Sequence, residues 1–189
     1  MAEENKPLPI AEIVTGVIIC IILIVFALPR FMNSGQEDVI GDQASNLYYE
    51  LVKAKNMSLK TRHRIWVQFN GTSGYTIFED SNGNGTADAG EPLHTTQLPP
   101  GIQFGANLNP PLKNVWGTGN VQQGIELDGG KTELAFSPKG NANRGGAVYF
   151  INKADVGVTN ANIWAVKIMG ATGDISVMKP SPDSSPPWK

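Results

Sequence analysis

The sequence contains one apolar run that is long enough to cross a lipid bilayer. This run is Ile10–Leu28, a stretch of 19 residues whose only charged side chain is Glu12. At about 1.5 Å per residue it spans about 28 Å as a helix, close to the hydrocarbon thickness of a bilayer. A secretory signal peptide has a positive leader and a cleavage site of small residues, and both are missing here. We therefore expect a retained single-pass membrane helix over 10–28.

An amphipathic helical pattern follows the apolar run. Between residues 36 and 60, apolar or small residues recur at spacings of three and four, which places them on one helix face. Acidic residues lie near the start of this segment and lysines near its end, an order that complements the helix dipole. Pro29 should kink the chain between the two helical segments. The residues of the apolar face are Ile40, Ala44, Leu47, Leu51, Ala54 and Ser58.

The hydrophobic period changes to two after residue 63. Ile65, Val67 and Phe69 alternate with more polar neighbours, and a Gly-rich turn then leads into a second alternating segment from Tyr75. This pattern predicts a β-hairpin. We expect turns from Asp80 to about Gly124, and further strands at Gly101–Phe104, Gly124–Leu127, Thr132–Phe136, Ala147–Ile151, Ile163–Met169 and Asp174–Met178. The sequence therefore predicts a β-rich domain over 63–179, and the Pro- and Ser-rich segment 180–189 predicts a disordered tail.

Composition and motifs indicate a protein that is not an enzyme. The chain has 15 basic and 17 acidic residues, so its net charge suggests no nucleic-acid partner. The only cysteine, Cys20, lies in the apolar run, which excludes a disulfide framework within the domain. The two histidines, His63 and His94, lie in different segments, and neither has a nucleophile or metal-ligand partner in the sequence. Hydrolase and nucleotide-binding motifs are also missing from the sequence.

The segment Asp80–Glu91 matches the twelve-residue pattern of a calcium-binding loop. Such loops place oxygen ligands at alternate positions, a glycine at the sixth position and a glutamate at the twelfth. No helical pattern flanks the segment, and Asn-Gly phrases also form ordinary β-turns, so a plain turn stays open as the other interpretation. The expected ligands are Asp80, Asn82, Asn84, the backbone carbonyl of Thr86, Asp88 and Glu91.

The chain combines an apolar helix that carries one glutamate and ends in Leu-Pro-Arg-Phe with an amphipathic continuation and a sheet. In this combination it resembles type IV pilins and type II secretion pseudopilins. These families have a glutamate near the mature N-terminus and a proline seventeen residues later, and Glu12 and Pro29 have this separation. The segments Tyr75–Leu93 and Phe136–Gly140 are similar to the H-type minor pseudopilin and FimT group. The resemblance implies an α+β, pilin-like fold over residues 8–179. A leader at 1–7 would precede a long N-terminal transmembrane helix over 8–62, packed on an antiparallel β-sheet domain.

The resemblance also implies a structural function in a bacterial filament. The protein would be a minor pilin or pseudopilin of a pilus or type II secretion system, with other such subunits and the inner membrane as its partners. Its C-terminal domain would be periplasmic. Prepilin peptidase would cut between Pro7 and Leu8, although the family has glycine where this chain has Pro7. Glu12 would pair with the α-amine of a neighbouring subunit, and its place near the helix start also allows contact with lipid headgroups.

Two other functions stay open from the sequence. A FimT-like subunit for DNA uptake would need a basic patch that binds phosphates, and the only dense basic segment is Lys53–Arg64. Since most of that segment is expected at a helix end, DNA is not an expected partner. The other alternative is a membrane-anchored extracytoplasmic domain that binds Ca²⁺ through Asp80–Glu91 and belongs to no filament.

Overall fold

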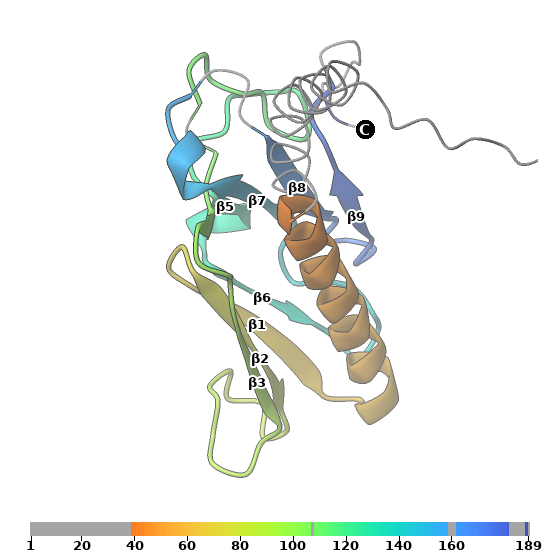
Figure 1. Ribbon diagram of the computed structural model, residues 1–189. Helices are drawn as coiled ribbons and strands as arrows, with labels where there is room; N and C mark the ends of the chain where they lie inside the picture. Colours follow the sequence, from red (N-terminus) through yellow and green to blue (C-terminus); the bar gives the residue numbers. More distant parts are fainter. Residues whose placement is uncertain (1–38, 107, 159–161, 182–187, 189) are drawn as a thin grey trace, which may run out of the picture. The chain divides into compact units, whose positions relative to one another are not determined.

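The computed structural model describes residues 39–106, 108–158, 162–181 and 188. A helix occupies residues 39–61 and is followed, in the described ranges, by nine strands (Figure 1). No helix within these ranges is long and apolar enough to cross a membrane, and the expected membrane segment 10–28 lies outside them. The strands are β1 (Arg64–Asn70), β2 (Gly74–Asp80), β3 (Leu93–Gln97), β4 (Ile102–Phe104), β5 (Ile125–Leu127), β6 (Glu133–Phe136), β7 (Gly146–Asn152), β8 (Ile163–Ile168) and β9 (Ile175–Met178).

The strands form two antiparallel sheets. The first sheet has the order β3-β2-β1-β6, and the second has the order β4-β7-β8-β9, with β5 also paired to β7. The expected hairpin is confirmed, because Val67 of β1 lies opposite Ile77 of β2, and Asn70 lies opposite Gly74 at the turn. Val67 also lies opposite Leu134 of β6, a strand more than sixty residues later in the sequence. Each sheet thus contains a pairing between strands that are distant in the chain, β1 with β6 in the first and β4 with β7 in the second.

One face of the helix forms the main hydrophobic core together with both sheets. Leu47 and Leu51 have no exposed surface, and Ala54 is 1 % exposed. They belong to one cluster with side chains of β1, β6, β7 and β8, so the helix lies across both sheets (Figure 1). The spacing of these residues is the one that the sequence predicts for a helix packed on a domain. The described part of the fold is therefore one helix packed on antiparallel sheets.

The second sheet is covered on both faces. Along β7, Val148 and Phe150 face the main core, whereas Ala147, Tyr149 and Ile151 belong to a second cluster on the opposite face. Trp188 contributes to this second cluster. The alternation explains why β7 reads as a continuous apolar run, since neighbouring side chains of a strand point to opposite faces.

The C-terminal segment differs from the sequence-based expectation at Trp188, which lies in the tail predicted to be disordered. Its ring is 3 % exposed and packs against Tyr149, and its indole N–H donates to the carbonyl of Lys113 over 2.8 Å. The Pro- and Ser-rich composition around it hides this anchor, because a single aromatic side chain leaves no periodic pattern. Trp188 is thus part of the folded domain.

The helix ends at residue 61, where polar contacts attach it to two turns. Arg62 adopts a left-handed conformation with φ of 61°, and its N–H donates to the Ser58 carbonyl, an arrangement that ends helices. The buried Ser58 hydroxyl lies 2.9 Å from the carbonyl oxygen of Ser137. The Lys55 ammonium donates to the carbonyl oxygens of Thr172 and Gly173. The helix end is therefore held to the 137–140 turn and to the β8–β9 turn.

The region expected to be turn-rich, Asp80 to about Gly124, contains a strand that the sequence did not predict. This strand is β3, with the sequence LHTTQ and largely exposed side chains. It pairs with β2 and forms the edge of the first sheet. Its mostly polar side chains give no alternation of apolar and polar residues, so only the pairing with β2 defines it.

We predict that Leu51→Ala lowers the free energy of unfolding by about 2–5 kcal/mol, because it leaves a cavity between the helix and the sheets. The measurement is urea unfolding of the full-length chain in detergent micelles, followed by circular dichroism. Asn56→Ala, at an exposed position of the same helix, should change the free energy of unfolding by less than about 0.5 kcal/mol. Equal effects of the two substitutions would contradict this account of the core.

Candidate functional site

The loop 80–91 lies on the face of the first sheet that points away from the helix. Because Ile65 and Val67 belong to the main core, the alternate residue Trp66 points to the opposite face, where Phe78 lies beside it. Gly85 approaches the Trp66 ring so closely that a Cβ atom there would lie 3.3 Å from a ring carbon. The loop therefore covers the Trp66 ring, which would otherwise face solvent.

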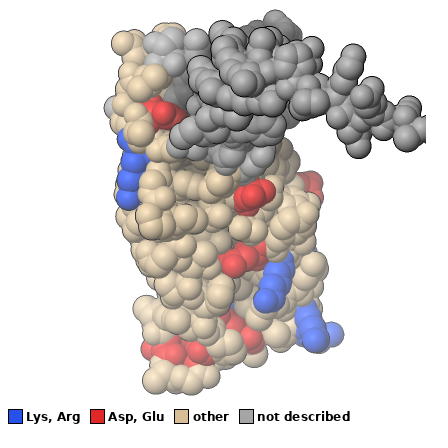
Figure 2. All heavy atoms as spheres, viewed as in Figure 1, with Lys and Arg blue, Asp and Glu red and all other residues tan. Residues whose placement is uncertain are grey.

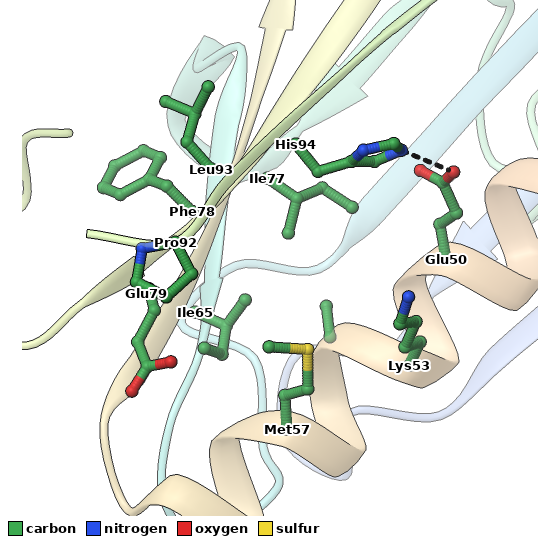
Figure 3. A pocket seen from close by; sticks show the side chains of 11 residues that line it. Glu50, Lys53, Met57, Ile65, Ile77, Phe78, Glu79, Pro92, Leu93 and His94 are labelled. Carbon is green, nitrogen blue, oxygen red and sulfur yellow. Dashed lines mark hydrogen bonds and ion pairs between the residues drawn. The ribbon is translucent and has the colours of Figure 1, made fainter. Parts of the chain in front are cut away.

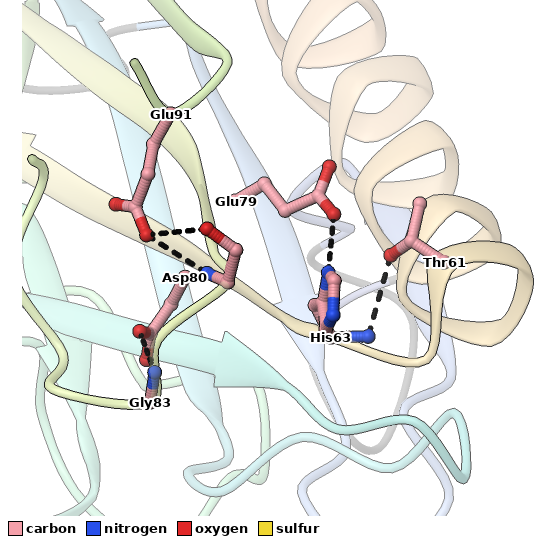
Figure 4. Close-up of polar contacts among 7 residues, drawn as sticks. Thr61, His63, Glu79, Asp80, Gly83 and Glu91 are labelled. Carbon is pink, nitrogen blue, oxygen red and sulfur yellow. Dashed lines mark hydrogen bonds and ion pairs between the residues drawn. The ribbon is translucent and has the colours of Figure 1, made fainter. Parts of the chain in front are cut away.

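Asp80 holds the first half of the loop in place. It is only 2 % exposed, and its carboxylate accepts three hydrogen bonds from the protein. The indole N–H of Trp66 and the N–H of Gly85 donate to Oδ2 over 3.0 and 3.1 Å. The N–H of Gly83 donates to Oδ1 over 2.7 Å (Figure 4). A buried carboxylate needs such donors, and here they fix the loop backbone to the sheet.

Asp88 and Glu91 hold the exposed half of the loop. The side-chain amides of Asn82 and Asn84 both donate to Asp88 Oδ2 over 2.6 Å, and these bonds lower the pKa of Asp88. Glu91 accepts the N–H of Asp88 and both the N–H and the hydroxyl of Ser81. These bonds lower the pKa of Glu91, and the bond from Asp88 is the largest cause. The loop is thus closed by contacts within the protein.

The expected calcium ligands separate into two groups in the structure. Asp80 and Glu91 accept backbone N–H donors, as described above. In the exposed group, the amide N–H groups of Asn82 and Asn84 donate to Asp88 Oδ2, and Thr86 donates its N–H and hydroxyl to Asn84 Oδ1. Within the described ranges, no group of three or more His, Cys, Asp or Glu side chains is placed to hold a metal ion. The exposed group is the part of the loop whose chemistry, amide and carboxylate oxygens, suits Ca²⁺.

Both histidines contact carboxylates that lie far from them in the sequence. His63 Nδ1 lies 2.6 Å from Glu79 Oε1 (Figure 4), and His94 Nε2 lies 3.2 Å from Glu50 Oε1. The second contact joins the helix to β3, the strand that the sequence did not predict, so sequence reasoning missed it. Burial raises the pKa of the neighbouring Tyr75, and the charge of Glu50 adds to the rise.

The cluster of Glu50, His94 and Thr96 does not have the geometry of a nucleophile relay. The Thr96 hydroxyl lies 3.2 Å from His94 Nε2, which is the same ring nitrogen that contacts Glu50. A catalytic relay uses one ring nitrogen for the nucleophile and the other for the carboxylate. The cluster therefore connects the helix to the edge strand.

The basic segment Lys53–Arg64 does not present all its charges as one patch. Lys55 points to the β8–β9 turn, where its ammonium also lies 3.7 Å from the Asp174 carboxylate. On the face shown in Figure 2, acidic and basic side chains are interspersed. The expected assembly residues Glu12 and Pro29, and the expected processing site between Pro7 and Leu8, lie outside the described residues.

Comparison with known proteins relates the chain to one family. The model of a family described as "Type II transport protein GspH" matches residues 43–171, which include most of the helix and strands β1 to β8. The minor pseudopilin EpsH from the type 2 secretion system of Vibrio cholerae has a similar structure, with 13 % sequence identity and a TM-score of 0.49. The similarity covers 74 % of this chain and 96 % of that chain. The comparison with curated proteins gives no match.

We predict that Asp80→Ala releases the loop from the sheet. The three donors that bond to the carboxylate lose their acceptor, and leaving buried donors unsatisfied costs about 1–3 kcal/mol. Amide hydrogen exchange at Gly83 and Gly85 should accelerate, and the total emission of the four tryptophans should shift to longer wavelength as Trp66 becomes exposed. Asp155→Asn, at a partly exposed position outside the loop, should leave both signals unchanged. Unchanged exchange in Asp80→Ala would contradict the role of this carboxylate.

Proposed function

The chain belongs to the GspH family of type II transport proteins, and we propose that it acts as a minor pseudopilin, a structural subunit of the type II secretion system. The observation that carries this function is the family match, because it includes most of the helix and most of both sheets in one continuous segment. The described part of the fold agrees with such a role, since a helix packed on sheets is a rigid body suited to assembly. The match favours a function in secretion over the two alternatives, a subunit for DNA uptake and a Ca²⁺-binding domain that acts outside a filament.

We propose that residues 10–28 anchor the protein in the bacterial inner membrane and pack against neighbouring pseudopilin subunits. The length and apolarity of this segment support the proposal. The domain that follows would then be extracytoplasmic. Glu12 would pair with the α-amine of a neighbouring subunit, because a carboxylate within a bilayer is costly unless an opposite charge compensates it. Pro29 would bend the chain where it leaves the membrane.

We propose that processing by prepilin peptidase occurs between Pro7 and Leu8 and supplies the free α-amine for such pairing. The separation of Glu12 and Pro29 supports this position, since it places the mature N-terminus at Leu8. The protein is purified from membranes, and the mass of its N-terminal peptide is measured. This mass distinguishes a chain cut before Leu8 from a chain that keeps its leader. A methylated Leu8 is the expected result, and an intact Met1 would contradict it.

We predict that Glu12→Ala reduces incorporation into the pseudopilus about 100-fold, because an unpaired partner in a buried ion pair costs about 3 kcal/mol. The measurement is the amount of the protein in sheared pseudopili, relative to its amount in the membrane, in cells with the other pseudopilins. Glu4→Ala removes the same charge from the leader and should leave incorporation unchanged. Equal incorporation of Glu12→Ala and the unchanged chain would contradict the assembly role.

We also propose that the loop 80–91 binds Ca²⁺ through its exposed group. The side chains of Asn82, Asn84 and Asp88 lie within hydrogen-bond distance of one another and carry oxygens of the kind that the ion prefers, which supports this idea. Each amide now directs its N–H group to Asp88 and would have to turn its oxygen toward the ion. Asp80 and Glu91 would hold the loop and complete the ligand set. In the chain as described, these carboxylates are occupied by protein donors, so binding would require part of that network to rearrange.

The prediction for Ca²⁺ is a rise in the melting temperature relative to the protein in chelator. Binding to the folded state alone stabilises it by about 1 kcal/mol when free Ca²⁺ is about five times the dissociation constant. Asp88→Asn should reduce this rise, whereas Asp155→Asn should retain it. No shift at millimolar Ca²⁺, or the same shift in Asp88→Asn, would contradict the proposal.

A further inference from the structure

The first sheet has an open edge at β3. This strand lies at the end of the order β3-β2-β1-β6, and no described strand pairs with its outer side. Its five residues are mostly exposed, and prolines precede and follow it at Pro92 and Pro99. Unpaired strand edges present rows of backbone donors and acceptors that another extended chain can bind.

Two backbone hydrogen bonds show which residues of β3 face β2. The N–H of Leu98 donates to the Ser73 carbonyl over 2.7 Å, and the N–H of Glu79 donates to the Pro92 carbonyl over 3.1 Å. In an antiparallel pair, residues alternate between those bonded to the neighbour and those turned away from it. On the β3 side, both bonds are made by even-numbered residues, Pro92 and Leu98. The backbone N–H and carbonyl groups of the even positions from 92 to 98 therefore face β2.

The odd positions of β3 therefore direct their backbone groups outward. Leu93, Thr95 and Gln97 each present an N–H and a carbonyl to the open side of the sheet. This edge can accept one short extended segment. The Leu93 side chain is 57 % exposed and adds an apolar contact beside it.

A groove lies next to this edge, between the helix and strands β2 and β3. It has a volume of about 200 Å³. Its apolar lining comes from Ala54 and Met57 of the helix and from Ile65 and Ile77 of the sheet (Figure 3). The groove thus has room for one large apolar side chain.

The charged groups of the groove are mainly acidic. Glu50 and Glu79 lie in its lining, with side chains 26 % and 12 % exposed, and Lys53 is the only Lys or Arg there (Figure 3). Each carboxylate contacts a histidine ring nitrogen, and both histidines are more exposed than the carboxylates. A cationic side chain that enters from solvent would compete with these histidines for the two carboxylates.

We propose that this surface binds an extended segment of a partner protein that carries an apolar residue flanked by Lys or Arg. The segment adds a strand to β3, places its apolar side chain in the groove, and brings its basic side chains to Glu50 and Glu79. A second copy of this chain is disfavoured, because it would bring the same carboxylates to the contact. The binding surface consists of described residues only and does not depend on the role in secretion.

The test uses three labelled peptides and the full-length chain in detergent micelles, with binding measured by fluorescence anisotropy. The first peptide is Lys-Val-Leu-Val-Lys, and the second replaces both lysines with glutamate. The third has the first sequence with alternate backbone nitrogens methylated, which removes donors from one edge. We expect the first peptide to bind about tenfold more tightly than either of the others.

Substitutions in the chain separate strand pairing from charge. Thr95→Pro removes an outward N–H without removing a bond to β2. It should weaken binding of the first peptide about tenfold. Glu79→Gln keeps the shape of the side chain and should reduce the preference for the lysine peptide over the glutamate peptide. Glu133→Gln removes the same charge at β6, the opposite edge of this sheet, and should change neither result. If Thr95→Pro fails to fold, the Glu79→Gln result and the methylated peptide still decide the question.

Several outcomes would overturn the proposal. One is no saturable binding of any peptide up to about 1 mM. Another is equal binding of the methylated and unmethylated peptides, which would exclude strand pairing. Equal binding of the lysine and glutamate peptides would exclude the stated charge of the partner. Self-association of the chain that disappears in Thr95→Pro would assign the edge to a second copy.

Discussion

The contact between one helix face and two antiparallel sheets supports the rest of the structure. Leu47, Leu51 and Ala54 lie at the centre of this contact, and each is almost completely buried. The first sheet is joined to the helix through the side chains of β1, and the second through those of β7. Since each sheet buries one face against the same helix, loss of that packing would separate the two sheets from their common core.

The loops that carry the candidate sites depend on this scaffold through a few buried polar groups. Asp80 fixes the 80–91 loop because its carboxylate accepts donors from both the sheet and the loop. Ser58 and Lys55 attach the helix end to turns that follow β6 and β8. Except for the exposed bond from Lys55 to Thr172, these bonds are partly shielded from water, which strengthens them. The domain thus presents its loops in defined positions, as a subunit of an assembly requires.

The two sheets differ in what they leave exposed. The second sheet is covered on its outer face by the cluster around Tyr149 and Trp188, which leaves little of that face for a partner. The first sheet is covered by a loop on one face and by the helix on the other, but β3 leaves an open edge beside a groove. A surface of this kind is compatible with assembly through the N-terminal helix, because it uses different residues of the chain.

The sequence by itself determined the elements whose signal is local. The spacing of Leu47 and Leu51 predicts the helix face, the alternation around Val67 predicts the hairpin, and the glutamate–proline separation indicates the family. The tertiary structure alone decided β3, the contacts of Asp80 and His94, and the burial of Trp188. Each of these depends on a partner that is distant in the sequence or on a strand without an apolar pattern. Local periodicity predicts which face of an element is buried, whereas the identity of its neighbour is set by the pairing of the whole fold.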